Sequence, residues 1–169
     1  MKNNIIRLAG IAYESLVNGP GLRRVFFAQG CAHNCDGCFN PSTHDFNGGE
    51  LRNIDDLIED VKINPLIKGI TFSGGDPFYQ AEAFAYMAEE IKKLKLNIWC
   101  YTGYKIEDIL NNSLGDSAMH LLKNLDVLVD GKFDKNKMDD KIKFRGSSNQ
   151  RIIDVQQTLK NKSIVTFDI

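Results

Sequence analysis

The chain lacks a long apolar run, an excess of charge of one sign and an apolar leader. Its 169 residues carry 21 basic and 22 acidic side chains, which gives a formal net charge of −1. A nearly neutral chain does not create the positive field that gathers nucleic acid or an anionic membrane surface. The first residues, Met1 to Arg7, lack the core of a secretory signal, and no segment approaches the length of a membrane span. We therefore expect neither nucleic acid nor a membrane as a partner.

Cysteine is scarce, and the few cysteines are unevenly placed. Of the four, Cys31, Cys35 and Cys38 stand close together, separated by three residues and then by two. This spacing suits one small inorganic cluster better than a pair of disulfides. Cys100 lies far away in the apolar run 98–101, where we expect a small buried core residue. Free thiols without an export signal indicate the reducing cytoplasm.

A fourth clustered cysteine is missing, which excludes a ferredoxin-type site held by four thiolates. Three thiolates can each hold one iron of a [4Fe–4S] cube and leave the fourth iron without a protein ligand. An open coordination position is typical of a reactive metal site. The alternative is tetrahedral zinc with His33 or His44 as the fourth ligand, although His33 stands too close to two of the cysteines to reach the same ion comfortably. A redox disulfide would not need the third cysteine.

Predicted strands and helices alternate along the chain. We expect strands at 24–28, 69–73, 97–101, 126–130 and 163–167, and helices at 54–62, 80–95, 105–111 and 117–124. Alternation of this kind predicts an α/β fold with a parallel sheet wrapped by helices. A full barrel takes about eight strands and roughly 250 residues, and only about four to six strands fit here. The expectation is a single domain over residues 1–169, built as an incomplete TIM-type β/α barrel.

Several polar or glycine-rich turns follow the predicted strands, and all of them should meet at one rim of the sheet. They are the cysteine loop, the turn Ser73-Gly74-Gly75-Asp76-Pro77, Thr102-Gly103 and Asp130-Gly131. The glycine turn lacks the Lys-Ser/Thr of a phosphate loop. Its two glycines allow the backbone to approach a ligand, and its free carbonyl groups can accept hydrogen bonds from an ammonium group. We therefore predict one shared active site at this rim.

With both motifs in view, the chain resembles the radical S-adenosylmethionine enzymes, through Cys31-x3-Cys35-x2-Cys38 and Gly74-Gly75-Asp76-Pro77. The run Asn18-Gly19-Pro20-Gly21-Leu22-Arg23 is similar to that of the glycyl-radical-enzyme activases. The closest resemblance is to the anaerobic ribonucleoside-triphosphate reductase activating proteins, through segments 31–40, 126–133 and 144–151. The resemblance extends over roughly residues 16 to 155, and its blocks occur in the order of the family.

The resemblance implies an activase with two cofactors, a [4Fe–4S] cluster held by Cys31, Cys35 and Cys38 and S-adenosyl-L-methionine at the open iron. A low-potential donor such as flavodoxin would supply an electron for reductive cleavage of S-adenosylmethionine. The resulting 5′-deoxyadenosyl radical would remove hydrogen from a backbone glycine of the reductase. Chemistry driven by the cofactors needs no catalytic acid or base from the chain. The cofactor-binding residues that the resemblance implies are Gly37, Cys38, Phe39, Ser73, Gly74, Gly75 and Asp76.

One position departs from the wider superfamily, in which the residue before the third cysteine is usually aromatic and lies against the adenine. Here that residue is Gly37, as in the reductase activators, and Phe39 is our candidate for part of the adenine surface, with a core role as its alternative. The roles of His33, Asp130 and the run 145–150 stay open. Alternative functions are activation of another glycyl radical enzyme, such as pyruvate formate-lyase, or a zinc-bearing binding module without activity.

Overall fold

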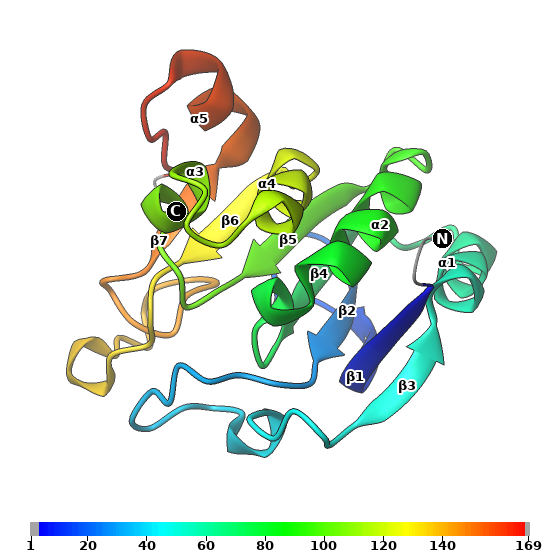
Figure 1. The fold of residues 1–169 in the computed structure, drawn as a ribbon, viewed down its shortest axis with the longest axis horizontal. Helices are drawn as coiled ribbons and strands as arrows, with labels where there is room; N and C mark the ends of the chain where they lie inside the picture. Colours follow the sequence, from blue (N-terminus) through cyan, green and yellow to red (C-terminus); the bar gives the residue numbers. More distant parts are fainter. Residues whose placement is uncertain (1–3, 168–169) are drawn as a thin grey trace.

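A mixed sheet forms the centre of the computed structural model, which describes residues 4–167 (Figure 1). Within these residues the sheet has seven strands in the order β3-β1-β2-β4-β5-β6-β7. Their bounds are β1 Ile5–Ser15, β2 Arg23–Ala28, β3 Glu50–Asn53, β4 Gly69–Gly74, β5 Asn97–Tyr101, β6 Val127–Asp130 and β7 Arg151–Asp154. The strands β2, β4, β5 and β6 run parallel, whereas β1, β3 and β7 pair antiparallel at the two sides. The structure thus confirms an α/β fold with parallel central strands.

Helices connect the parallel strands and lie over one face of the sheet (Figure 1). They are α1 Ile54–Ile63, α2 Ala81–Lys92, α3 Ile106–Leu110, α4 Asp116–Lys123 and α5 Val155–Asn161, with short 3-10 helices η1 Pro41–Thr43, η2 Pro77–Gln80 and η3 Lys135–Lys137. Helix α1 begins where the sequence predicts, because the Asn53 side chain accepts a hydrogen bond of 3.1 Å from the Asp56 backbone N–H. Its apolar stripe is buried, so the amphipathic pattern explains both its start and its orientation.

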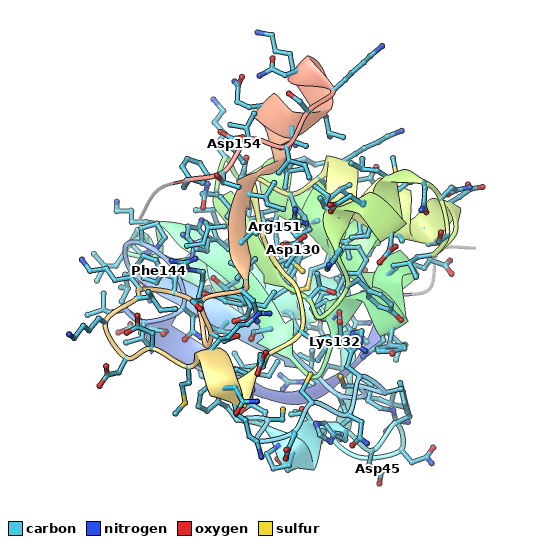
Figure 2. All side chains as sticks on the ribbon, turned by 90° about the vertical axis from the view of Figure 1, so that its left-hand side faces the viewer. Asp45, Asp130, Lys132, Phe144, Arg151 and Asp154 are labelled. Atoms are coloured by element: carbon cyan, nitrogen blue, oxygen red, sulfur yellow. The ribbon has the colours of Figure 1, made fainter. Side chains whose placement is uncertain are left out.

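On the opposite face of the sheet, the segment that joins β6 to β7 lies against the central strands. Trp99, Val127, Val129 and Ile152 are buried there. Phe144, from the joining segment, lies on this face with its ring centroid 5.4 Å from that of Trp99 (Figure 2). A loop therefore covers this part of the face, held by the contact of Phe144 with Trp99 and by the hydrogen bond from the Gln150 side chain to the Gly131 carbonyl.

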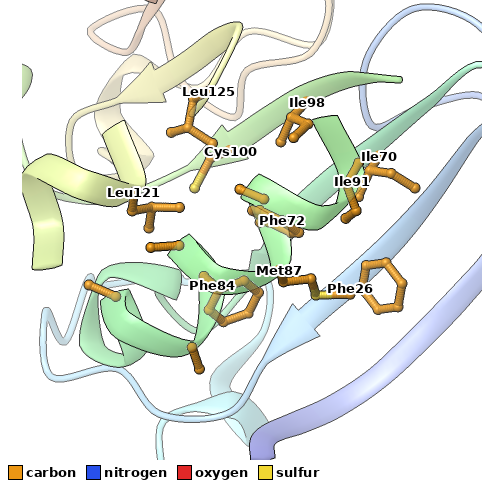
Figure 3. Packing of buried hydrophobic residues seen from close by; sticks show 14 of the residues in the cluster. Phe26, Ile70, Phe72, Phe84, Met87, Ile91, Ile98, Cys100, Leu121 and Leu125 are labelled. Atoms are coloured by element: carbon orange, nitrogen blue, oxygen red, sulfur yellow. The ribbon is translucent and has the colours of Figure 1, made fainter. Parts of the chain in front are cut away.

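The main core lies between the helices and the sheet (Figure 3). The rings of Phe72 on β4 and Phe84 on α2 meet edge to face, with centroids 4.8 Å apart. Cys100 has no exposed surface and packs in the same cluster, which confirms the prediction of a core residue. Burial raises the pKa of its thiol well above the ordinary value, so this thiol stays protonated.

The sheet edges differ from the sequence prediction. The predicted strand at 163–167 is wrong as an element, since Thr166 forms only an isolated bridge with Ile153. The strand that pairs with β6 is β7, which directly follows the polar run 145–150 and was not expected, and the helix α5 follows it. The strands β1 and β3 were also not expected, and they bring the number of strands in residues 4–167 to seven, above the expected four to six.

Candidate iron–sulfur site

The turns that follow the parallel strands meet at one cleft of about 380 Å³, as the sequence predicts. From these turns the cleft is lined by Cys31, His33, Cys35, Cys38, Phe39, Asn40, Ser73, Gly74, Gly75, Thr102, Gly103 and Gly131. Residues of the run 144–150 line another part of the wall. The meeting of these turns follows from the shared direction of β2, β4, β5 and β6, whose carboxyl ends lie at one edge.

The three clustered cysteines are free thiols that are partly exposed on this cleft. The Cys38 sulfur accepts a hydrogen bond of 3.4 Å from the Asn40 backbone N–H and lies 3.4 Å from His44 Nε2. Burial raises the pKa of the Cys31 thiol, and the negative charge of Asp76 adds to this effect, whereas a hydrogen bond from the His33 backbone N–H opposes it. The thiols therefore have polar groups beside their sulfur atoms, as metal-binding cysteines do.

A cube and a single ion place different demands on the three sulfurs. Among residues 4–167, no three His, Cys, Asp or Glu side chains converge on a position for one metal ion. In a [4Fe–4S] cube each thiolate binds a different iron, so its ligands have to border a common cavity. Three free thiols on one cleft fit the cube.

The glycine turn borders the cleft, and its glycines also allow two backbone segments to approach each other closely. Gly74 has a φ of 101°, and a Cβ there would clash with the backbone nitrogen of Ala28. A Cβ on Gly75 would lie 2.5 Å from the Gly30 carbonyl oxygen and 2.9 Å from that of Thr43. Both glycines therefore leave room for the neighbouring backbone, including the residue directly before Cys31. Both also line the cleft, and their approach to a ligand stays a prediction.

Asp76 lies beside the cleft and not on its wall. Its side chain is 1% exposed. The carboxylate accepts hydrogen bonds from the backbone N–H groups of Phe78 and Gly103, both at 2.9 Å, and from the Thr102 hydroxyl at 2.8 Å. His33 Nε2 lies 2.6 Å from Oδ2 of the same carboxylate. The structure thus surrounds this predicted cofactor-binding side chain with protein donors.

Of the other predicted cofactor-binding residues, some line the cleft and one lies outside it. Cys38, Phe39 and Ser73 line the cleft, whereas Gly37 lies outside its wall, next to Phe133 and Lys135. Phe39 is 65% exposed and its ring centroid lies 4.8 Å from that of Phe133. The alternative of a core role for Phe39 is therefore wrong.

The run 145–150 holds the clearest candidate that the sequence analysis left without a role. Arg145 lines the cleft, and within residues 4–167 its buried Nε atom has no hydrogen-bond partner. One of its terminal nitrogens donates to the Gln150 carbonyl at 3.0 Å, while the Gln150 side chain donates to the Gly131 carbonyl at 3.0 Å. The guanidinium is thus held by one terminal nitrogen while its buried Nε–H lacks a partner, which suits an acceptor group of a bound ligand.

Comparisons with known proteins agree with this geometry. Residues 17–153 match the model of a family described as a 4Fe-4S single cluster domain. The class defined by fold and site is therefore that of single-cluster iron–sulfur proteins. Among solved structures, QueE from Escherichia coli superposes with a TM-score of 0.44 at 12% identity, over 60% of this chain and 54% of that one, which is too distant to assign a fold.

Curated relatives narrow the class further. The anaerobic ribonucleoside-triphosphate reductase-activating protein of Enterobacteria phage T4 is 39% identical over 142 residues, covering 80% of this chain and 86% of that protein. The protein of the same name from Vibrio cholerae is 38% identical, with 81% and 90% covered. That of Escherichia coli K12 is 37% identical, with 80% and 90% covered. The chain belongs to the family of anaerobic ribonucleoside-triphosphate reductase-activating proteins.

Proposed function

We propose that this chain generates a glycyl radical on an anaerobic (class III) ribonucleoside-triphosphate reductase, as an oxidoreductase that uses a [4Fe–4S] cluster and S-adenosylmethionine. The observation that carries the proposal is the meeting of three free thiols and the glycine turn on one cleft at the carboxyl ends of the parallel strands. The names of the curated relatives support the choice of reductase.

Cys31, Cys35 and Cys38 would hold the cluster, and the fourth iron would face the rest of the cleft. When bound, the cluster and S-adenosylmethionine supply low-potential electron transfer and radical abstraction of hydrogen. The chain's own part is to bind, orient and shield these groups. Hydrogen bonds to the Cys38 sulfur from Asn40 and His44 would stabilise the thiolate form.

S-adenosylmethionine would lie along the wall formed by the glycine turn and the run 144–150. Ser73, Gly74 and Gly75 would present backbone groups to it, together with Gly37, Cys38 and Phe39 on the side of the cysteine loop. The unpartnered Nε of Arg145 would donate to an oxygen of the cofactor, such as its carboxylate. Exposed Phe39 and the neighbouring Phe133 supply an apolar surface that limits the access of water.

We also propose that residues 1–169 form one radical S-adenosylmethionine domain whose sheet corresponds to an incomplete TIM-type β/α barrel. The parallel strands β2, β4, β5 and β6 and the helices over one face support this proposal. No helix within residues 4–167 is long and apolar enough to cross a membrane. A low-potential donor such as flavodoxin would reduce the cluster in the cytoplasm.

The test is activation of a candidate reductase under anaerobic conditions. Reconstituted protein should be brown and hold about four irons per chain. With reductant and S-adenosylmethionine it should produce a glycyl radical signal on the reductase in electron paramagnetic resonance. Deuterium placed on the reductase glycine should appear in 5′-deoxyadenosine. Label arriving only from solvent would contradict a protein substrate, and colourless protein with one tightly bound zinc would contradict the cluster.

A further inference from the structure

One side-chain contact joins the cysteine loop to the glycine turn. His33, which stands midway between Cys31 and Cys35, places Nε2 2.6 Å from Oδ2 of Asp76. Both side chains are buried, with 6% of His33 and 1% of Asp76 exposed. The two residues are 43 positions apart in the sequence, so the contact ties together two loops that could otherwise move independently.

The Asp76 carboxylate has no capacity left for a ligand. Besides His33 it accepts hydrogen bonds from Phe78, Thr102 and Gly103. An ionised carboxylate only accepts, so the hydrogen in the contact with His33 belongs to Nε2 of the imidazole. The contact is therefore directional, and it holds the imidazole of His33, which lines the cleft, against the carboxylate of the glycine turn.

The imidazole of His33 is also packed on its faces and edges. Its ring centroid lies 4.5 Å from that of Tyr104, at 75°, and 5.5 Å from that of Tyr79, at 54°. A Cβ on Gly103 would lie 2.6 Å from the His33 ring, so the glycine leaves the space that the ring occupies. The hydrogen bond and the packing together fix the orientation of the His33 side chain. They thereby also fix the centre of the loop between Cys31 and Cys35.

We propose that Asp76 is a positioning residue that holds the cysteine loop in its cluster-binding conformation through His33 and does not itself contact the bound cofactor. The inference rests on the proposed function for the identity of the cluster, but the contact between the loops exists without it. It assigns Asp76, the third residue of the Gly74-Gly75-Asp76-Pro77 turn, a task distinct from that of Ser73, Gly74 and Gly75. Outer-sphere partners of metal ligands typically change metal affinity on the order of tenfold to hundredfold when they are removed.

The experiment uses three variants: Asp76→Asn, His33→Leu and the double variant that carries both changes. The control variant is His120→Gln. His120 is a suitable control because it also pairs with a carboxylate, that of Glu89 at 3.0 Å, but on the exposed side of α4. His33→Gln is the conservative variant, since its amide nitrogen can donate to Asp76 as Nε2 does. Three quantities are measured without S-adenosylmethionine: loss of iron to a chelator, the midpoint potential of the cluster, and hydrogen exchange of peptide 31–38 in cluster-free protein.

We expect Asp76→Asn and His33→Leu to lose iron on the order of tenfold to hundredfold faster than the unmodified protein. The double variant should lose iron no faster than the more affected single variant, because both changes break the same contact. The midpoint potential should shift in the same variants, and exchange in peptide 31–38 should be faster. His33→Gln should restore most of the iron retention, and His120→Gln should match the unmodified protein.

Two results would overturn the inference. One is an Asp76→Asn protein that keeps its iron, potential and loop protection but binds S-adenosylmethionine weakly, which would mean direct contact with the cofactor. The other is a double variant whose effect is the sum of the two single effects. If Asp76→Asn does not fold, the difference between His33→Leu and His33→Gln decides. If the unmodified protein holds no iron, the proposed function fails, while hydrogen exchange still tests the contact between the loops.

Discussion

Two buried aspartates at the carboxyl ends of the parallel strands β4 and β6, which lie on either side of β5, have similar surroundings and different tasks. Asp76 follows β4 and Asp130 ends β6, and each accepts a hydrogen bond of 2.9 Å from the backbone N–H at the start of a helix, that of Phe78 or that of Ile106. The two aspartates differ in the basic side chain that contacts the carboxylate. His33 belongs to the cysteine loop, whereas Arg151, 2.9 Å from Asp130, begins the edge strand β7 (Figure 2).

A buried aspartate with a basic partner therefore orders the cysteine loop at Asp76 and the edge of the sheet at Asp130. Arg151 also contacts Glu107 at 2.6 Å, so the pair at β6 is part of a small ionic network. These contacts raise the pKa of Arg151 above its ordinary value, with the hydrogen bond to Asp130 as the largest cause. We expect damage near Asp76 to release iron while the fold persists, and damage near Asp130 to weaken the fold while iron is retained.

The most severe change on the site side is removal of a cluster ligand. Cys31→Ala, Cys35→Ala and Cys38→Ala should each abolish cluster assembly and cleavage of S-adenosylmethionine, because the cube needs all three thiolates. Cys100→Ala is the matched control, since Cys100 lies in the core. Iron analysis after anaerobic reconstitution measures the outcome. Loss of iron in Cys100→Ala comparable with that in Cys35→Ala would show that the fourth iron has a protein ligand.

Gly75→Ala tests whether the glycine turn supports the cysteine loop. The new Cβ would lie 2.5 Å from the Gly30 carbonyl oxygen, so Cys31 and the residues after it should shift. We expect iron retention to fall roughly tenfold or more, together with affinity for S-adenosylmethionine. Gly10→Ala is the control, because a Cβ there meets no atom within 4 Å. Full iron content with weak cofactor binding would restore the simpler view that this glycine serves only the ligand.

Asp130→Asn should lower the stability of the fold and leave iron retention unchanged. Loss of the charge leaves Arg151 poorly compensated, and we expect unfolding free energy to fall by about 2–3 kcal/mol, since Arg151 is partly exposed and the pair is only partly shielded. The thermal midpoint of cluster-free protein should fall by roughly 5–10 °C. Iron retention in the folded variant should stay at the level of the unmodified protein. An Asp130→Asn protein that releases iron without losing stability would show that Asp130 supports the site as Asp76 does, and not the edge of the sheet.

The smallest expected effect concerns Glu107 and pH. The hydrogen bond from Arg151 holds the pKa of the Glu107 carboxyl below its ordinary value. Its contribution to stability is therefore complete above the unfolded-state pKa and is lost as pH falls through the lower folded-state value. Because Glu107 is half exposed, the contribution should be at most about 1 kcal/mol. Thermal unfolding of Glu107→Gln should differ from that of the unmodified protein at neutral pH and converge with it in acid; a constant difference would exclude the ionic origin.

The parallel centre of the fold was predictable because its signals are local. A β-branched strand such as 69–73, the Asn53 cap and the apolar stripe of α1 each depend on neighbouring residues. The meeting of the strand-end turns followed from the parallel arrangement alone. The edge strands were less predictable, because β1 alternates imperfectly and pairs with β2 through two register shifts. A strand of that kind is defined by its partner more than by its own pattern.

Within the site, residue types were easier to predict than orientations. Three cysteines at short spacing indicate ligands whatever the surrounding fold. The spacing contains no information on whether Asp76 faces the cleft or His33, because that choice depends on Thr102 and Gly103 from the next strand end. The same holds for Arg145, whose unpartnered Nε becomes visible only when its neighbours are placed. Contacts of high sequence separation decided the case of Asp76.

Because Cys100 is deeply buried, the number of cysteines that react with an alkylating reagent reports cluster loading and unfolding. A thiol-alkylating mass tag reaches only a thiol that is accessible and able to form thiolate, and Cys100 meets neither condition. Cluster-free native protein should accept three tags, one at each cysteine of the cleft, and cluster-loaded protein should accept none. A fourth tag reports global unfolding. Mass spectrometry of one sample can thus count loaded, empty and unfolded molecules separately.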